Sequence, residues 1–474
     1  MTTLNTANKI VHLGFGAFHR AHQLLYTAET NQQATQQWRY YEVNLRNDSE
    51  IIEQLKAQNY QLHVLEKGAK NKRLKEVKAV IEYAYHPALD GIDAILERMA
   101  DPEVVIVSLT VTEKGYCLDP ASGKLDLNNC EIQADLKNPT VPVSAIGYIV
   151  RALQLRKERG IPAFSVMSCD NLMENGFVAK NAVLGFASHL DPALADWIEQ
   201  NSSFPCTMVD RIVPAMTADS LQEVADVLGQ SDPCGVVCEE YRQWVIEDHF
   251  VSGRPEWNLI GAELVEDVRP FEEMKLRMLN GSHSFLAYLG YLAGYAHISD
   301  CMQDKNYHTA AYQLMLNEQA VTLCMPQGID LTRYANQLIE RYENPNIKHR
   351  TWQIAMDGSQ KLPIRMLASI RYHLAKGSSF KLLALGVAGW ARYVSGVDEQ
   401  NQPIDVKDPM VEKFQQIYAQ HGLTLAALDE LLNLEAIFPS ELTSNALFVE
   451  EVRAAFTSLL QVGAKQTVAN YINA

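Results

Sequence analysis

The first half of the chain alternates strand-like and helical segments, and this alternation limits the folds it can adopt. The run VVIVSLTV (104–111) is almost continuously apolar, which is typical of a strand buried on both faces of a parallel sheet. Strand-like runs at 9–16, 39–46 and 162–171 alternate with helical periods at 21–29, 49–58 and 144–160. We therefore predict an α/β fold whose N-terminal domain is doubly wound and of the Rossmann type.

The second half of the chain reads differently, because helical periods follow one another there and β-rich runs are almost absent. No long Pro-, Gly- or Ser-rich linker separates the halves, and the short stretch EDVRPFEEM (266–274) is the best boundary. We predict an α/β domain over residues 1–270 and a mostly α-helical domain over residues 271–474.

Composition excludes several classes of protein. The chain has 41 basic and 57 acidic residues, a net charge of −16 that repels nucleic acid. Eight cysteines in 474 residues do not form a disulfide scaffold, so we expect reduced thiols and a cytoplasmic location. The least polar run, 285–298, is too short to cross a bilayer, and the N-terminus lacks a signal-peptide pattern. These features argue against a nucleic-acid-binding or membrane protein and leave any kind of soluble enzyme open.

A glycine turn follows the first predicted strand and precedes a helix. Gly14, Phe15 and Gly16 form this turn, where a bare backbone can approach a pyrophosphate and the helix N-terminus supplies free N–H groups. The third glycine of the usual dinucleotide fingerprint is missing, because Ala17, Phe18 and His19 occupy that stretch. The pattern predicts a dinucleotide site, and an ordinary tight turn remains the alternative.

The second predicted strand should end near an acid that binds the adenosine ribose. Glu42 and Asp48 are the candidates, and Asp48 lies just past the strand end. Arg46 beside it would instead favour the 2′-phosphate of NADP. We expect NAD, with Asp48 as the ribose ligand.

A second set of polar residues lies in KLRMLNGSHSF (275–285), close to the predicted domain boundary. On an α-helix, Lys275, Asn280 and His283 share one arc. A lysine beside apolar surface loses ammonium solvation and can act as a general base, while asparagine amides donate to a developing alkoxide. These residues therefore predict acid/base chemistry, and a solvated surface helix is the alternative.

Other polar residues could join such a site. Asn171 ends a predicted strand, where ligands bind in open α/β sheets, although an Asp-Asn turn explains it equally well. Asp210 and Lys361 could be substrate contacts or ordinary charged residues. His12, His19 and His22 lack an obvious third metal ligand, so we predict no metal site.

Taken together, these motifs resemble the mannitol dehydrogenase family of polyol-specific long-chain dehydrogenases, over nearly the whole chain. The resemblance rests on VHLGFGAFHRAH, TVTEKGY, MSCDN, TMVDRIVP, KLRMLNGSHS and DGSQKLP, which occur in this order. It implies that Lys275 is the general acid/base, that Asn171 and Asn280 polarise the substrate oxygen and that His283 holds the substrate. It also implies that the loop at 10–21 binds NAD and that Val209, Asp210 and Lys361 contact the substrate.

The resemblance further implies reversible hydride transfer between D-mannonate and D-fructuronate in hexuronate breakdown, without a metal and by a monomer. Gln353 stands where mannitol-acting members carry an arginine, which argues against a plain mannitol activity. Arg350 and Arg365 flank that segment and are candidates to meet a carboxylate. The alternatives are tagaturonate/altronate, D-arabinitol or mannitol 2-dehydrogenase activity, or a non-catalytic NAD sensor.

Overall fold

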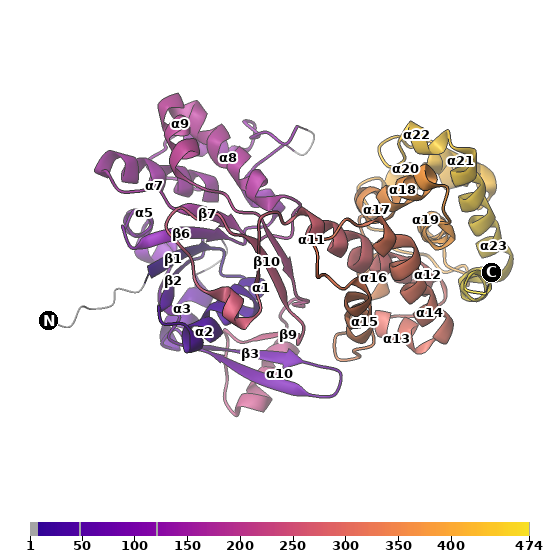
Figure 1. The fold of residues 1–474 in the computed structure, drawn as a ribbon, viewed down its shortest axis with the longest axis horizontal. Helices are drawn as coiled ribbons and strands as arrows, with labels where there is room; N and C mark the ends of the chain where they lie inside the picture. Colours follow the sequence, from indigo (N-terminus) through magenta and orange to yellow (C-terminus); the bar gives the residue numbers. More distant parts are fainter. Residues whose placement is uncertain (1–7, 47–48, 120–121, 474) are drawn as a thin grey trace. The chain divides into compact units, whose positions relative to one another are not determined.

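A computed structural model describes residues 8–46, 49–119 and 122–473. The chain divides into two compact units, residues 1–269 and 270–474. The first unit combines sheets and helices, and the second is helical (Figure 1). The predicted fold class, a Rossmann-type α/β domain followed by a helical domain, is confirmed.

The first unit is built on a parallel sheet in the strand order β5-β2-β1-β6-β7. The chain thus starts in the middle of the sheet and winds outward to both edges, which is the doubly wound topology. The strands are β1 (Asn8–Leu13), β2 (Trp38–Val43), β5 (Ile81–Tyr85), β6 (Val104–Leu109) and β7 (Ser165–Ser168).

Successive side chains of a strand point to opposite faces of the sheet. Neighbouring residues of the central strands therefore pack into two different hydrophobic cores. Val11, Tyr41 and Val107 pack into a core with one set of helices, and Ile10 and Tyr40 pack into the opposite core. Figure 1 shows the two layers on opposite sides of the sheet. The first layer comprises α5 (Ile92–Met99), α7 (Ala145–Arg159) and α8 (Asn175–Leu190), and the second comprises α1 (Ala17–Ala21), α2 (Gln23–Gln33) and α3 (Glu50–Ala57).

Two three-stranded sheets complete the first unit, in the orders β4-β3-β9 and β11-β10-β8. The sequence does not predict the β3–β4 hairpin. Strand β4 reads KRLKEV, and most of its charged side chains are exposed. The segment therefore lacks the alternation of apolar and polar residues that would indicate a strand. The strands are β3 (Leu62–Lys67), β4 (Lys72–Val77), β8 (Thr207–Asp210), β9 (Val236–Glu239), β10 (Gln243–Glu247) and β11 (Glu263–Val265).

Shorter elements connect these layers. Gly160 ends α7 in the left-handed conformation with φ 68°, which glycine adopts without steric cost. The remaining helices of the first unit are α4 (Pro87–Asp90), α6 (Cys130–Lys137), α9 (Pro192–Asn201) and α10 (Ala218–Leu228), with 3₁₀ turns η1 (Glu113–Tyr116) and η2 (Trp257–Ile260).

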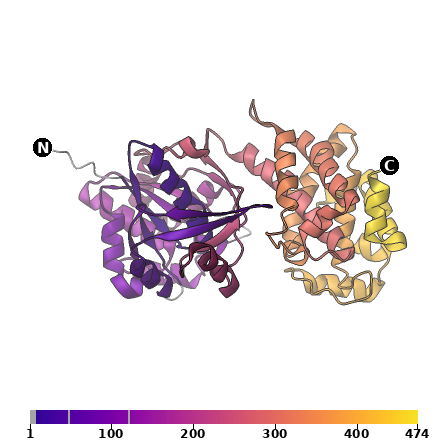
Figure 2. The same ribbon diagram turned by 90° about the horizontal axis from the view of Figure 1, so that it is seen from below.

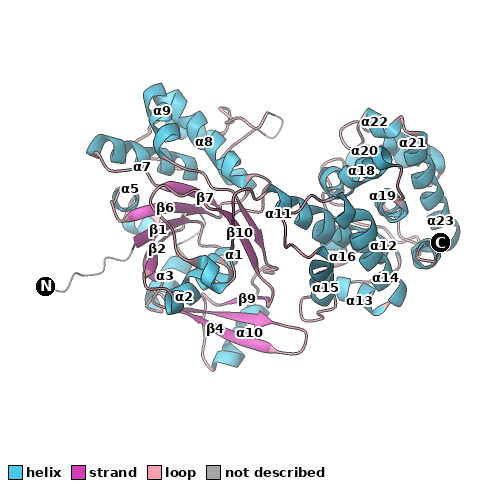
Figure 3. Cartoon of the chain, viewed as in Figure 1, coloured by secondary structure: helices cyan, strands magenta, loops and turns pink. Residues whose placement is uncertain are grey.

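The described residues of the second unit form helices and no strand longer than an isolated bridge (Figures 2 and 3). Helix α12 (Ser282–Leu292) is buried along almost its whole length and packs against α13, α16, α19 and α23. The others are α11 (Arg269–Met274), α13 (Ile298–Gln303), α14 (Lys305–Gln313), η5 (Ala320–Thr322), α15 (Leu331–Tyr342), α16 (Thr351–Ile354), α17 (Gly358–Leu362), α18 (Ala368–Lys376), α19 (Lys381–Tyr393), α20 (Val411–His421), α21 (Leu425–Leu432), α22 (Ser440–Thr443) and α23 (Ala446–Tyr471). Within the described residues, none of the chain's helices combines the length and apolarity needed to cross a membrane.

Three π-helical segments interrupt the helices of the second unit. They are η3 (Lys275–Gly281), η4 (Leu314–Gln319) and η6 (Pro363–Leu367), and η3 contacts both of the others. The α-helical geometry expected for 275–281 is therefore wrong. A π-helix bonds residue i to residue i+5, so Lys275 and Asn280 lie one turn apart.

Gly281 permits this packing. A Cβ atom at this position would lie 2.3 Å from Gln319 Nε2 and 2.7 Å from the backbone oxygen of Arg365. Both distances are far below van der Waals contact, and the second atom belongs to a backbone that cannot swing aside. The glycine that weakens an α-helix in isolation is thus required where η3 meets η4 and η6.

We predict that Gly281→Ala lowers the free energy of unfolding by about 1–3 kcal/mol, because overpacking at a close backbone contact has that cost. Urea or thermal unfolding of the full chain measures it. Gly16→Ala is the control for stability, because a Cβ there meets no atom within 4 Å. Stabilisation of Gly281→Ala, as expected for a glycine in an uncrowded helix, would show that the close contact is absent.

Candidate active site

The glycine turn is held by the strands on either side of it. Gly14 adopts φ 111°, its N–H donates to the Val43 oxygen at 2.9 Å, and Thr110 Oγ1 donates to the Gly14 oxygen at 2.8 Å. A Cβ at Gly14 would lie 2.2 Å from the Thr110 oxygen, so both the conformation and the space require glycine. Gly16 caps α1 in an extended conformation with open space before it.

Two adjoining cavities open at this turn. The first has a volume of 530 Å³, the second 520 Å³, and both are bordered by Gly16, Thr110 and Thr112. Phe15 and Gly14 line the first cavity, and Ala17, Phe18, Asn171 and Val209 line the second. Cavities of this size are typical of small-ligand sites. The predicted cofactor loop therefore borders both cavities, and Asn171 and Val209, which were predicted to contact the substrate, border the second one.

His19 and Glu42 lie behind the turn rather than on these cavities, which corrects two sequence-based candidates. Both side chains are fully buried, and His19 Nε2 lies 3.0 Å from Glu42 Oε1. Glu42 points inward because it follows Tyr41, which enters the other core. Burial raises the pKa of Glu42 to about 8 and lowers that of His19 to about 3, so the contact is a neutral hydrogen bond near pH 7.

His12 joins the same network. Its ring stacks on His19 with centroids 3.4 Å apart, its Nδ1 lies 2.8 Å from Ser108 Oγ, and its Nε2 lies 2.9 Å from Thr110 Oγ1. Burial lowers the pKa of His12 well below its usual value, so the ring is neutral and can pair with hydroxyl groups as donor or acceptor. These histidines support the turn.

Asp48, the predicted ribose ligand, lies outside the described residues. Arg46 lines the first cavity but its guanidinium pairs with Glu131 at 2.6 Å. Arg20 also lines this cavity, and its side-chain nitrogens donate to the backbone oxygens of Cys234 (2.6 Å) and Gly16 (3.3 Å). Sequence reasoning missed Arg20, although its place in the first turn after the glycines was a signal for an anion contact.

The end of β7 organises the second cavity. The Asp170 carboxylate accepts the N–H groups of Val111 (3.0 Å) and Thr112 (2.9 Å) and the hydroxyl of Tyr116 (2.7 Å). These bonds fix the loop that follows β6. Burial raises the pKa of Asp170. The next residue, Asn171, is exposed on the cavity side of this clamp.

Val209 and Asp210 lie in β8 and are both buried. Val209 borders the second cavity and pairs with Trp244 of β10, and Asp210 pairs with Gln243. The first unit thus brings together four of the residue groups selected from the sequence: the glycine turn, Asn171, Val209 and the strand that carries Asp210.

In the second unit, the predicted catalytic residues come from η3 and the first turn of α12. Lys275 is buried, with 7% of its surface exposed, and His283 is buried with 6% exposed. Asn280 is half-buried, one π turn after the lysine. A lysine and an amide aligned in this way can exchange a proton with an alcohol and donate a hydrogen bond to its oxygen.

His283 lies in a cationic and aromatic environment. Its ring stacks on Tyr342 with centroids 4.9 Å apart and meets His349 edge-on at 4.6 Å. Burial, with smaller contributions from His349 and Arg365, lowers its pKa well below the usual value, so the imidazole is neutral. Its Nε2 is buried and has no hydrogen-bond partner within the described part of the chain. Such an atom is suited to a substrate hydroxyl.

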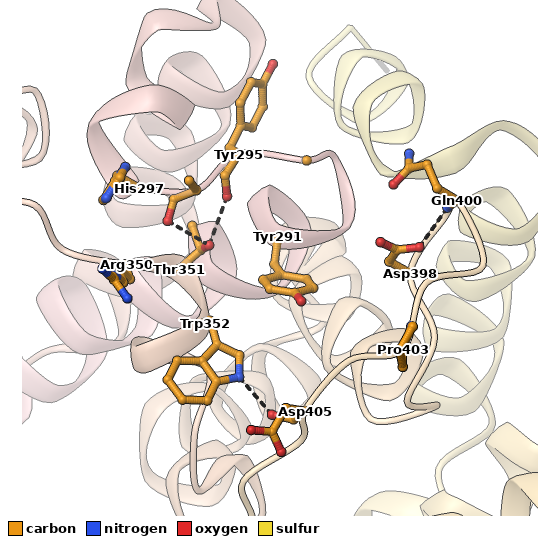
Figure 4. A pocket seen from close by; sticks show the side chains of 12 residues that line it. Tyr291, Tyr295, His297, Arg350, Thr351, Trp352, Asp398, Gln400, Pro403 and Asp405 are labelled. Carbon is orange, nitrogen blue, oxygen red and sulfur yellow. Dashed lines mark hydrogen bonds between the residues drawn. The ribbon is translucent and has the colours of Figure 1, made fainter.

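The three candidate carboxylate ligands differ in position. Lys361 Nζ donates to the Met356 oxygen at 2.5 Å, and burial lowers its pKa. Arg365 Nη1 donates to Ser284 Oγ at 2.9 Å, beside His283. Arg350 is exposed and lines a different cavity, together with Tyr291 and Trp352 (Figure 4). Arg365 thus contacts the residue after His283, and Lys361 acts electrostatically on His283, whereas Arg350 lines a different cavity.

The eight cysteines form no disulfide in the structure, and six of them are buried. Among residues 8–46, 49–119 and 122–473, no group of three or more His, Cys, Asp or Glu side chains is arranged to hold a metal ion. His22 Nε2 bonds to the backbone oxygen of Gln243 at 3.0 Å.

Known proteins resemble this chain in both sequence and fold. Two family models match, the mannitol dehydrogenase Rossmann domain over residues 8–259 and the mannitol dehydrogenase C-terminal domain over residues 267–460. D-mannonate oxidoreductase of Escherichia coli K12 is 59% identical over 98% of this chain and 95% of its own.

Two solved structures are similar over their whole length. The ternary complex of Pseudomonas fluorescens mannitol 2-dehydrogenase with NAD and D-mannitol has a TM-score of 0.82 and 36% identity, covering 99% of this chain and 95% of that one. A substrate-free D-sorbitol dehydrogenase has a TM-score of 0.88 and 31% identity, covering 97% and 94%.

The fold and the glycine turn define a protein of the Rossmann-type dehydrogenase class. The family models and relatives narrow this class, and the chain belongs to the mannitol dehydrogenase family. The resemblance found in the sequence motifs is confirmed.

We predict that Gly16→Ala weakens NADH binding by about tenfold or more without changing the melting temperature. The added methyl group meets no protein atom within 4 Å but narrows the cavity beside the turn, where we expect the cofactor pyrophosphate to bind. Fluorescence titration with NADH measures the affinity. Unchanged affinity in a normally folded variant would place the cofactor elsewhere.

Proposed function

We propose that the protein is an NAD-dependent oxidoreductase that interconverts D-mannonate and D-fructuronate in hexuronate breakdown. The reaction is D-mannonate + NAD⁺ → D-fructuronate + NADH + H⁺. The 59% identity to D-mannonate oxidoreductase supports the substrate, and the buried Lys275, with Asn280 one π turn after it and buried His283 in the next helix, supports the chemistry. The free cysteines are consistent with a reducing, cytoplasmic location.

The first unit fits a dinucleotide. Gly14 and Gly16 bring bare backbone to a cavity, and Arg20 adds a cation whose protein partners are neutral oxygens. NAD, when bound there, accepts and returns the hydride. Phe15, Ala17 and Phe18 would shape the cofactor cavities, while Asp48 would bind the ribose hydroxyls.

Lys275 would act as the general acid/base. In the oxidative direction its neutral amine takes the proton from the substrate hydroxyl as hydride leaves the same carbon. In the reductive direction its ammonium returns that proton to the oxygen. The amides of Asn171 and Asn280 would donate hydrogen bonds to the same oxygen as negative charge develops on it. In this proposal the lysine and the two amides perform the work that a metal ion does in other alcohol dehydrogenases.

The remaining polar groups would hold the substrate. Neutral His283 presents an unbonded Nε2 to a hydroxyl, and Asp210 and Lys361 supply an acceptor and a donor. Val209 would contact the carbon chain. Because the proposal rests on a sugar acid, at least one cation must receive its carboxylate.

We predict that Lys275→Ala lowers kcat by about 10²–10⁴-fold while NADH affinity stays within about twofold of wild type, because the variant loses only the proton carrier. Steady-state kinetics and NADH titration measure the two effects. Partial restoration by added small primary amines would identify the missing group as a base.

Lys305→Ala is the matched control, since Lys305 is an exposed lysine of the same unit. Full turnover in Lys275→Ala would eliminate the lysine mechanism. Wild-type protein that binds NADH but turns over no polyol, ketose or sugar acid would instead be a non-catalytic sensor.

A further inference from the structure

Arg365 is a cation enclosed by neutral partners. It lies in η6, where its Nη1 donates to Ser284 Oγ at 2.9 Å and to the backbone oxygen of Asn280 at 3.5 Å. Its Nε is buried and has no hydrogen-bond partner, and the guanidinium forms no ion pair with any described residue. The side chain is only partly accessible.

Among the described residues, no carboxylate forms an ion pair with the positive charge of Arg365. A guanidinium stays protonated in proteins, and burying it without a counter-ion is unfavourable unless a bound anion supplies the missing charge. Asp357, just before α17, lies 3.7 Å from Lys361 Nζ; its charge also attracts Arg365, but it forms no ion pair with this arginine. The two cations lie four residues apart on consecutive helical segments and repel each other.

Other incomplete polar groups lie around Arg365. His283 Nε2 and the Tyr288 hydroxyl are both buried without a hydrogen-bond partner among the described residues, and both interact electrostatically with Arg365. Ser284, which holds the guanidinium, directly follows His283 in α12. The set matches a ligand that carries one anionic end and several hydroxyl groups.

We propose that the Arg365 guanidinium receives the carboxylate of the substrate and thereby selects sugar acids over neutral polyols and ketoses. The inference rests on the proposed function and specifies how its substrate class is recognised. A carboxylate can take two parallel hydrogen bonds from an arginine, which fixes the position of the sugar chain as well as its charge. Arg350, the other candidate arginine, is exposed and lines the separate cavity shown in Figure 4.

The test compares Arg365→Gln and Arg365→Lys with wild type on D-fructuronate and on D-fructose, a similar ketose that lacks the carboxylate. We expect kcat/KM for fructuronate to fall by about 10²-fold or more in Arg365→Gln, and less in Arg365→Lys, which keeps the charge but loses the fork. Activity with fructose should stay within about threefold. Arg371→Gln is the control, because Arg371 is an exposed arginine of the next helix that pairs with Glu441.

Inhibition constants add a second measurement for substrates that are turned over slowly. The ratio of Ki for D-mannitol to Ki for D-mannonate should fall by about 10²-fold in Arg365→Gln if the arginine reads the charge. NADH titration and the melting temperature establish that each variant is folded. If Arg365→Gln does not fold, the same comparison of sugar acid with neutral sugar is made with Arg365→Lys.

The outcomes separate this inference from the proposed function. Equal losses on fructuronate and fructose would make Arg365 a structural residue, and no loss, or a selective loss in Arg350→Gln instead, would also overturn the assignment. Wild-type protein that fails to reduce fructuronate would contradict the proposed function itself.

Discussion

The close approach of three π-helical segments around Gly281 is the constraint on which the chemistry of the second unit depends. The absence of a side chain at this glycine lets η3 lie against Gln319 of η4 and the backbone of Arg365 in η6. The wider π turn aligns Lys275 with Asn280, and the same contact brings Arg365 to Ser284 beside His283. On a regular α-helix the lysine and the amide would stand about 140° apart, at the two ends of the arc that they share.

A different kind of constraint operates in the first unit, where buried polar side chains hold the ends of the parallel strands. His12, Ser108 and Thr110 tie the glycine turn to β6, and Asp170 ties the loop after β6 to the end of β7. Networks of this kind are stable only when every member is bonded, so they specify one loop conformation. The cavities at the carboxyl ends of these strands are therefore preformed, as expected for a doubly wound sheet.

Much of this architecture could be predicted from the sequence. The continuous apolar run of β6 and the alternation before and after it identified the doubly wound unit, and the short motifs identified the family. The β3–β4 hairpin was not predictable, because its exposed strand is charged. The π-helical geometry of η3 was also inaccessible, because it depends on contacts with η4 and η6, which lie far away in the sequence. Glu42 and His19 looked like cofactor ligands, although the strand alternation of β2 buries Glu42 and His19 packs from α1 against it, and Arg350 looked equivalent to Arg365.

The central claim is that the chain transfers hydride between NAD and a sugar acid. It is tested most directly by the rate of NADH oxidation by the wild-type protein with a panel of D-fructuronate, D-tagaturonate, D-fructose and D-ribulose or D-xylulose. We expect the highest kcat/KM with D-fructuronate, by at least about tenfold over each neutral ketose. A clear preference for D-fructose over D-fructuronate would contradict it.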